Sequence, residues 1–202
     1  MTAHVHHSCR CGQTKLKIAV PARSAGTHVR CYCVDCQTAA NLYDNADDVL
    51  TPAGGTDIWQ TTPDQIQITA GQEHLKILRL SPKGLLRWHA GCCNTPVMNT
   101  LPNLKIPFVG TVLRQSQRAQ HEAVYGPAIC EAYTASARPG QRTPGKDRGF
   151  KRAGAAVLRR MFLALVSGRA KHNPLRGPDG APIAPIEVIS RETRAAARPD
   201  HL

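Results

Sequence analysis

The sequence predicts an all-β fold of antiparallel strands, followed by a C-terminal basic amphipathic helix and an extended tail. Short stretches that favour strands alternate with turn-forming residues at intervals of about ten residues, which is typical of an antiparallel all-β domain. Before them, the period-two segment 14–20 and the segment 27–30 are expected to form strands, and a short helix is expected at 37–42. The later strands are expected at 56–60, 65–69, 75–80, 85–89 and 106–113.

Composition divides the chain into three parts. A strand-rich domain is expected over 1–113, a connector with a flexible loop over 114–150, and a basic helix with a Pro-rich tail over 151–202. The stretch 137–146 combines Pro, Gly and charged residues, which favours a flexible loop. At 202 residues the chain is long enough for one domain with its own core and an appendage.

A C-terminal helix is expected from about residue 148 to Ser167, and Gly168 is expected to end it. Its apolar residues recur at helical spacing, while Lys and Arg occupy other positions around the helix. Such a helix can pack its apolar stripe on its own domain or lie on an anionic surface. Closely spaced prolines after the helix favour an extended, partly disordered tail over 172–202.

The net charge of +12 is concentrated in the C-terminal part of the chain. Residues 1–113 contain 10 Lys and Arg against 7 Asp and Glu, whereas residues 114–202 contain 16 against 7. This asymmetry indicates either an anionic partner for the tail or a solvated basic surface. Nucleic acid is the less favoured partner, because no nucleic-acid-binding motif accompanies the charge and aromatic residues make up only 4% of the chain.

No segment of the sequence favours export or membrane insertion. The N-terminus lacks an apolar stretch behind basic residues, so no signal peptide is expected. The longest apolar run near the C-terminus, Met161–Val166, is far too short to span a bilayer, so no transmembrane segment is expected. These features predict a cytoplasmic protein, in which clustered cysteines stay reduced.

The chain contains eight cysteines, of which seven form three short clusters and only Cys130 stands alone. In a reducing compartment, spacings this short are typical of thiolate ligands to a metal ion rather than of disulfides. Zinc, as one or two ions, is the expected cofactor because it prefers four thiolate or imidazole ligands. The candidate ligands are Cys9 and Cys11, then Cys31, Cys33 and Cys36, then Cys92 and Cys93.

The spacing within each cluster indicates how many ligands it supplies. Residues two apart in a strand point to the same side, so Cys9 and Cys11 can bind one ion. The Cys31–Cys36 run can supply three ligands and leave a fourth zinc position open, as in catalytic sites. Adjacent residues in an extended chain face opposite ways. Cys92 and Cys93 are therefore expected to serve two sites, unless one of them is a buried thiol.

The order of these motifs resembles that of the glutathione-dependent formaldehyde-activating enzyme family, which also includes centromere protein V. The resemblance covers residues 5–113, and the segment Trp88–Pro96 is similar to the signature of a divergent bacterial branch of unassigned function. The matching motifs are Cys9-x-Cys11-Gly12, Cys31-x-Cys33-x-x-Cys36, and Cys93 followed by Thr95-Pro96-Val97.

The resemblance implies a zinc-binding β-tent core with two ions. Cys9, Cys11 and Cys93 would hold a structural zinc, and the three cysteines of the middle cluster would hold a second, more labile zinc. In that family the second site is tied to glutathione and to S-hydroxymethylglutathione, the adduct of glutathione with formaldehyde. The implied activity is that of a carbon–sulfur lyase acting on thiol–aldehyde adducts, with a small-molecule thiol or aldehyde as its partner.

The sequence departs from the family pattern at the last motif, which reads Cys-x-x-Cys-Gly in the family. Ala90 stands where the first of these cysteines is expected, and Asn94 replaces the glycine. The structural site then has three matching ligands, and Cys92, His89 or an N-terminal His is a candidate for the fourth.

Three functions are compatible with the sequence. The chain is a carbon–sulfur lyase whose middle cysteine cluster binds a working zinc, a zinc-stabilised module whose basic tail binds an anionic partner, or a protein in which all metal is structural. Zinc binding contributes about 10–16 kcal/mol in small metal-dependent domains, which suffices to stabilise a β core poor in aromatic residues. No residue is predicted as a general acid or base, and neither the substrate nor the oligomeric state follows from the sequence.

Overall fold

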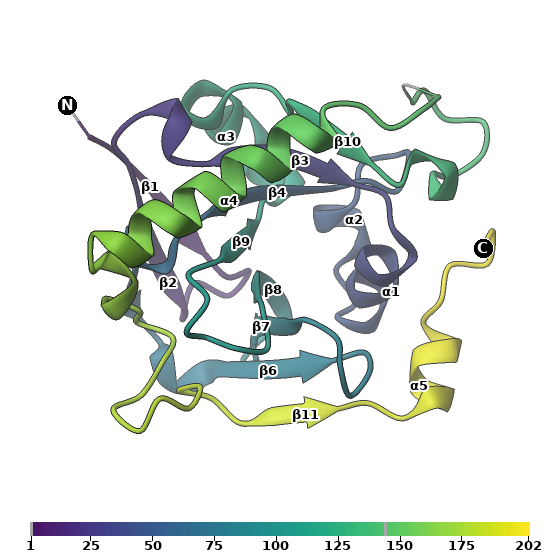
Figure 1. The fold of residues 1–202 in the computed structure, drawn as a ribbon. Helices are drawn as coiled ribbons and strands as arrows, with labels where there is room; N and C mark the ends of the chain where they lie inside the picture. The colour runs from purple at the N-terminus through teal and green to yellow at the C-terminus, as the bar shows by residue number, and fades with distance from the viewer. Residues whose placement is uncertain (1, 144) are drawn as a thin grey trace.

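Strands from most of the chain form two sheets in the computed structural model, which describes residues 2–143 and 145–202. Within those residues an eight-stranded sheet has the order β10-β3-β4-β9-β8-β7-β6-β11, and a three-stranded sheet has the order β1-β2-β5 (Figure 1). The strands are β1 (Ala3–Ser8), β2 (Lys15–Val20), β3 (Thr27–Cys31), β4 (Thr56–Thr61), β5 (Ile66–Ala70), β6 (Leu75–Arg79), β7 (Leu86–Ala90), β8 (Thr95–Thr100), β9 (Val109–Val112), β10 (Cys130–Ala132) and β11 (Ile186–Val188).

Helices occupy the segments between and after these strands. The α-helices are α1 (Val34–Leu42), α2 (Ala46–Val49), α3 (Arg118–Tyr125), α4 (Phe150–Val166) and α5 (Arg191–Ala196). Short 3₁₀ turns occur at Arg23–Ala25, Pro63–Gln65, Gln72–His74, Gln115–Gln117, Thr134–Ser136 and Arg169–Lys171. No helix among the described residues is both long and apolar enough to cross a membrane.

The predicted all-β fold class, and with it the β-tent core, is wrong. The protein is mixed α/β, with 31% of residues helical and 29% in strands, and its sheets combine parallel with antiparallel pairs. The inner pairs of the large sheet are antiparallel, but β10 runs parallel to β3 and β11 runs parallel to β6. These two edge strands have three residues each, which is too short for a recognisable alternation of polar and apolar residues. Each pairs with a strand that is far away in the sequence, so no local pattern predicts the pairing.

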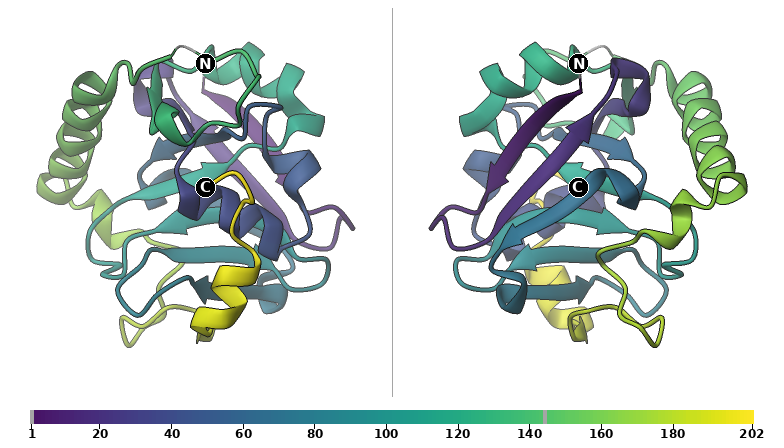
Figure 2. Two further views of the ribbon diagram at one scale, coloured as in Figure 1. Left: turned by 90° about the vertical axis from the view of Figure 1, so that its right-hand side faces the viewer. Right: turned by 90° about the vertical axis from the view of Figure 1, so that its left-hand side faces the viewer.

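The main core lies between the two sheets. Alternate residues of β2 are buried, as the period-two pattern of segment 14–20 predicts, and Leu16 and Ile18 pack in one cluster with Trp59 and Trp88 of the large sheet. The views in Figure 2 show the three-stranded sheet across one side of the molecule and α4 at its outer edge. The core therefore needs both sheets, because each supplies one apolar face.

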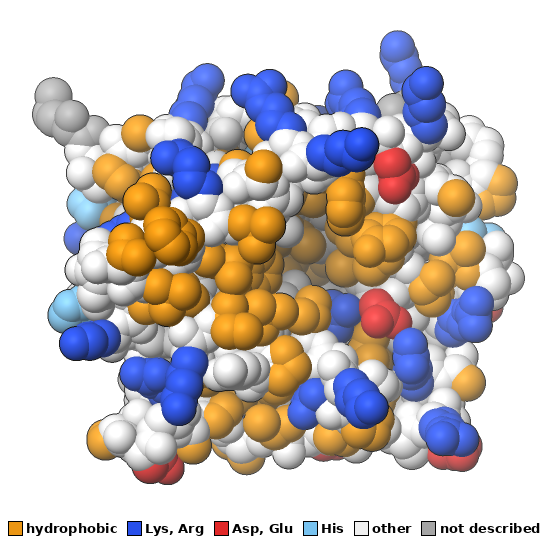
Figure 3. Space-filling model, viewed as in Figure 1, with side chains coloured by type: hydrophobic (Ala, Val, Ile, Leu, Met, Phe, Trp, Pro, Cys, Tyr) orange, Lys and Arg blue, Asp and Glu red, His pale blue; other side chains and the backbone are white. Residues whose placement is uncertain are grey.

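Helix α4 lies close to the expected helix, but its apolar stripe faces outward. Leu158, Phe162 and Val166 are 66%, 62% and 64% exposed, whereas the small residues Ala153 and Ala164 face the protein. Figure 3 shows apolar side chains gathered on this face and around a hollow beside α4. The stripe therefore does not pack on its own domain, which was one of the two uses expected from the sequence.

The tail after α4 packs against the domain instead of extending from it. Strand β11 pairs with β6, and the carboxylate of Asp35 at the start of α1 accepts a hydrogen bond of 2.8 Å from Arg194 of α5. The side chain of Asn41 donates to the carbonyl of Ala197 at 2.9 Å. The loop predicted at 137–146 includes residue 144, which lies outside the described residues.

Candidate metal centres

Four cysteines from the first and third sequence clusters lie together at one end of the core. Cys9 follows β1, Cys11 lies in the next turn, and Cys92 and Cys93 lie in the turn between β7 and β8. All four Sγ atoms are within 4.8 Å of one another. The Cys9–Cys11, Cys11–Cys92 and Cys9–Cys92 sulfur separations are 3.5, 3.4 and 3.8 Å.

These separations fit a zinc ion. Four sulfurs placed about 2.3 Å from one zinc ion in a tetrahedron lie about 3.8 Å apart. Backbone and hydroxyl groups already support the cluster, since the amide of Thr14 donates to the Cys9 sulfur at 3.2 Å and Thr95 Oγ1 lies 3.1 Å from the Cys93 sulfur. A zinc ion held by all four sulfurs would have no coordination position left for a substrate.

The turn between β7 and β8 explains how adjacent cysteines reach one cluster. The expectation that Cys92 and Cys93 face opposite ways assumes an extended chain, but residues 91–94 form a turn and Asn94 has a left-handed φ of 54°. The two sulfurs are consequently 3.9 Å apart. Burial opposes ionisation of Cys93, but hydrogen bonds from Thr95 and Cys11 outweigh it and lower the pKa of Cys93 to about 6.

The other fourth-ligand candidates lie outside both cysteine groups of the described chain. His89 is buried against the ring of Tyr43, with the ring centroids 4.7 Å apart. His7, the buried histidine of the N-terminal segment, has its Nε2 3.0 Å from the hydroxyl of Tyr125. Ala90 ends β7 and is fully buried. The structure therefore places Cys92, rather than a histidine, beside Cys9, Cys11 and Cys93.

The second group consists of Cys31, Cys33 and Cys36, whose Sγ atoms also lie within 4.8 Å of one another. Cys31 ends β3, Cys33 is the N-cap of α1, and Cys36 lies in the first turn of that helix. Three sulfurs can hold a zinc ion and leave one coordination position for another ligand. The part of the chain that the structure describes thus has two cysteine groups that can hold a metal ion, and they differ in ligand number.

Positive groups stabilise negative charge at the three-cysteine group. The N-terminal end of α1 carries a partial positive charge beside Cys33 and Cys36. Hydrogen bonds from Cys31 and Cys33, and then the nearby guanidinium of Arg87, hold the pKa of Cys36 well below its usual range. The same contacts with Cys33 and Cys36 raise the pKa of Cys31. Arg87 is itself buried, which lowers the pKa of its guanidinium, but the nearby Cys36 and then Cys33 outweigh this effect and raise that pKa.

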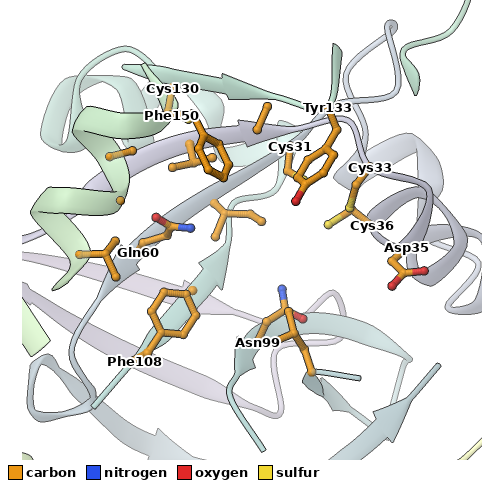
Figure 4. Close-up of a pocket in the computed structure, with 18 of the residues that line it drawn as sticks. Cys31, Cys33, Asp35, Cys36, Gln60, Asn99, Phe108, Cys130, Tyr133 and Phe150 are labelled. Carbon is orange, nitrogen blue, oxygen red and sulfur yellow. The ribbon is translucent and has the colours of Figure 1, made fainter. Parts of the chain in front are cut away.

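A cavity of about 640 Å³ opens directly over these three cysteines. Figure 4 shows Cys31, Cys33 and Cys36 at one end of it and the rings of Phe108 and Phe150 farther away. Its remaining wall is mostly apolar, and the hollow is visible from outside in Figure 3. The polar side chains that line it are Gln60, Arg87, Asn99, Tyr133, Asp35 and Ser136.

The edge of the cavity nearest the cysteines is shaped by residues 132–136. Tyr133 adopts a left-handed φ of 60°, and Figure 4 shows its hydroxyl directed into the cavity. Partial burial, followed by the nearby cysteine sulfurs, raises the pKa of Tyr133, so its hydroxyl keeps its proton at neutral pH. The side chain of Gln37 in α1 links the segment at Tyr32 to the segment at Ser136. Its amide donates hydrogen bonds to the backbone carbonyls of these two residues at 2.8 and 2.7 Å.

Sequence reasoning missed most of the cavity wall. Arg87, Asn99 and Tyr133 come from β7, β8 and the segment after β10, and no spacing in the sequence relates them to the cysteines. Helix α4 contributes a further wall through Phe150 and Val157. One local feature could have pointed to Arg87 as a functional residue. It is a charged residue between two apolar residues in β7, a strand that is buried on both faces.

Comparison with known proteins identifies the family of the chain. Residues 1–187 match the family described as "Family of unknown function (DUF6151)". The chain belongs to this family. In this DUF6151 chain the matched region includes both cysteine groups and α4, so the candidate metal centres and the cavity lie inside the family's shared region.

A comparison with curated proteins finds no match. Among solved structures, a Rhodobacter sphaeroides protein is 13% identical, with a TM-score of 0.37, over 53% of this chain and 83% of that chain. These findings do not support membership of the formaldehyde-activating enzyme family, which the cysteine motifs resemble.

Proposed function

We propose that this DUF6151 protein binds two zinc ions, one structural and one that receives a thiol ligand in the cavity. Cys9, Cys11, Cys92 and Cys93 would hold the structural ion, and Cys31, Cys33 and Cys36 would hold the second. The observation that supports this division is that the three-cysteine group, and not the four-cysteine group, lines the 640 Å³ cavity.

The donor set of the second site favours a soft ligand. Zinc bound there would act as a Lewis acid and stabilise a thiolate at its fourth position. The cavity volume lies in the range of about 300–1,000 Å³ that is common for small-molecule sites. Arg87, Asn99 and Gln60 offer donors and acceptors for the polar part of such a ligand, and Phe108 and Phe150 offer apolar contacts.

The reaction that fits this site best is carbon–sulfur cleavage or formation in a thiol–aldehyde adduct, such as S-hydroxymethylglutathione. In the cleavage direction the carbon–sulfur bond breaks and the sulfur leaves as thiolate with the bonding electron pair. The adduct's hydroxyl gives its proton to solvent water as the carbonyl of formaldehyde forms. The protein would stabilise the leaving thiolate at the cysteine site, beside the guanidinium of Arg87. Glutathione is the candidate thiol, and the protein would be a carbon–sulfur lyase.

The alternative is a non-catalytic zinc-stabilised module with a basic surface for an anionic partner. The observation that favours it is α4, which carries Lys151, Arg152, Arg159 and Arg160 and no acidic residue. Under this alternative both ions are structural, and added thiol leaves the zinc content unchanged.

The number of zinc ions per chain, measured for wild type and two cysteine variants, distinguishes the two proposed functions. Native mass spectrometry of the wild-type chain is expected to show two zinc ions, of which one is lost first to a mild chelator and is released or capped by glutathione. Cys36→Ser is expected to retain one ion and a cooperative thermal transition. Cys130→Ser is the control, since Cys130 is a buried thiol that lines the same cavity but lies outside both groups.

The reaction is tested by exchange between formaldehyde and its glutathione adduct, followed by NMR. Wild type and Cys130→Ser are expected to accelerate the exchange, and Cys36→Ser is expected to lose the acceleration. A single tightly held ion that does not respond to glutathione would refute the two-site proposal. Two ions with no acceleration would refute the lyase and leave thiol binding.

A further inference from the structure

A second cavity, of about 390 Å³, lies on the opposite flank of α4 and is lined by arginines. Arg152, Arg159 and Arg160 approach it from α4, and Arg23 approaches it from the 3₁₀ turn before β3. The spacing of seven and eight residues from Arg152 places the three helix arginines on one face of α4. The residues that line this cavity include no Asp or Glu.

Arg160 is a buried cation without a carboxylate partner. Arg160 is 8% exposed, and its hydrogen bonds within the described part of the chain go only to neutral acceptors, the hydroxyl of Thr27 at 2.5 Å and the carbonyl of Gln60 at 3.5 Å. Among the described residues, none of the four cavity arginines forms an ion pair with an acidic side chain. Burial, and then the charge of Arg159, lowers the pKa of Arg160, so its surroundings oppose its own charge.

The cavity wall also contains a buried donor, the indole of Trp59. Trp59 lines the cavity, is 1% exposed and stacks on Tyr125, and its indole Nε1 has no hydrogen-bond partner among residues 2–143 and 145–202. A buried cation without a counter-charge and a buried donor without an acceptor both destabilise the protein, and an anion at this place would supply the missing negative charge.

We propose that this cavity binds a phosphoryl group. A tetrahedral phosphate offers several oxygens and up to two negative charges, so it can accept hydrogen bonds from guanidinium groups on both sides of the cavity. A carboxylate has two oxygens and one charge, which one arginine fork satisfies. Four arginines around one cavity therefore match a phosphate or phosphate ester better than a carboxylate.

Two kinds of ligand could supply the phosphoryl group. One is a small phosphate ester that fills the cavity. The other is a phospholipid headgroup, because the exposed Leu158, Phe162 and Val166 lie along α4 next to the arginine flank and would contact acyl chains. Both sources require the same arginines, so one set of variants tests the site itself.

Calorimetric titration of the full chain with inorganic phosphate, at constant ionic strength and pH 7.5, tests the site. Saturable binding with one phosphate per chain is expected. Arg159→Gln is expected to weaken binding about tenfold, since it removes a charge-assisted hydrogen bond, and adding Arg152→Gln is expected to weaken it further. Lys151→Gln is the control, because Lys151 is an exposed cation on the same helix that does not line the cavity.

The second arm uses vesicles of phosphatidylcholine with and without phosphatidic acid. Retention that requires phosphatidic acid and is displaced by inorganic phosphate indicates a lipid headgroup, and tight phosphate binding without vesicle retention indicates a small ester. Absence of saturable binding in both arms, or equal binding by Arg159→Gln and Lys151→Gln, would overturn the proposal. Cys36→Ser is expected to retain phosphate binding, so this site and the zinc function can fail independently.

Discussion

Replacing Cys9 by Ser is expected to abolish the cooperative unfolding transition of the protein. Cys9 is buried at the junction of the main core and the four-cysteine group, where its sulfur is 3.5 Å from Cys11 and 3.8 Å from Cys92. Under the two-zinc proposal this group holds the structural ion. Zinc contributes about 10–16 kcal/mol in small zinc-dependent domains, which is comparable with the whole stability of about 5–15 kcal/mol of an ordinary domain.

Thermal unfolding followed by circular dichroism, with zinc content measured on the same sample, checks this result. Cys130→Ser makes the same chemical change at another buried cysteine, so it is expected to keep a cooperative transition and both ions. Cys36→Ser is expected to keep the transition and lose one ion. Similar unfolding of Cys9→Ser and Cys36→Ser would contradict the division into a structural site and a working site.

Replacing Asp57 by Asn is expected to lower the free energy of unfolding by about 3–5 kcal/mol, the range for breaking a buried ion pair. The Asp57 carboxylate in β4 is buried and accepts hydrogen bonds from Arg30 at 2.9 and 3.0 Å and from Gln115 at 3.3 Å. It also lies 3.1 Å from Nε2 of His28. Asparagine keeps the shape but removes the charge, which leaves Arg30 without this partner in the sheet.

The same carboxylate makes stability depend on pH at the acid end. Hydrogen bonds from His28 and Arg30 outweigh the effect of burial and lower the pKa of Asp57 to about 2. The unfolded chain therefore binds this proton more readily than the folded protein does. The resulting stabilisation, about 2 kcal/mol, is present above about pH 4 and is lost as the pH falls toward 2.

Urea unfolding at several pH values between 2 and 6 measures both effects. Asp57→Asn is expected to be less stable than wild type at pH 6 and to show a flatter pH dependence. Asp35→Asn is the control, because Asp35 pairs with Arg194 in a half-exposed position and such pairs contribute about 0–1 kcal/mol. Equal losses in the two variants would show that the buried network does not contribute as described.

Local pattern predicted the antiparallel part of the fold but not its class. The alternation in segment 14–20 matches β2, and the predicted strands around 56–60, 75–80 and 85–89 match β4, β6 and β7. These strands could be recognised because each has its own alternation and flanking turns. Strands β10 and β11 have neither, and they turned the predicted antiparallel sheet into a mixed one.

The sequence predicted one of the two cysteine groups better than the other, because its ligands are neighbours in the chain. The spacing of Cys31, Cys33 and Cys36 predicted a three-sulfur group within one short segment, and the structure brings those sulfurs together. The meeting of Cys92 and Cys93 in one group depends on the turn at 91–94, and the extended-chain assumption missed it. Arg87 and Tyr133 reach the cavity from segments far apart in the chain, which no spacing rule could relate to the cysteines.

The sequence alone determined which residues can bind metal and that a basic helix follows the strands, because ligand chemistry and helical periodicity are written in neighbouring residues. Only the tertiary structure decided that four of the cysteines form one group, and that the other three line a cavity. It also decided that the apolar face of α4 points outward while its arginines line a second cavity. Those properties depend on which distant segments pack together, and packing is set by the whole chain rather than by any one stretch of it.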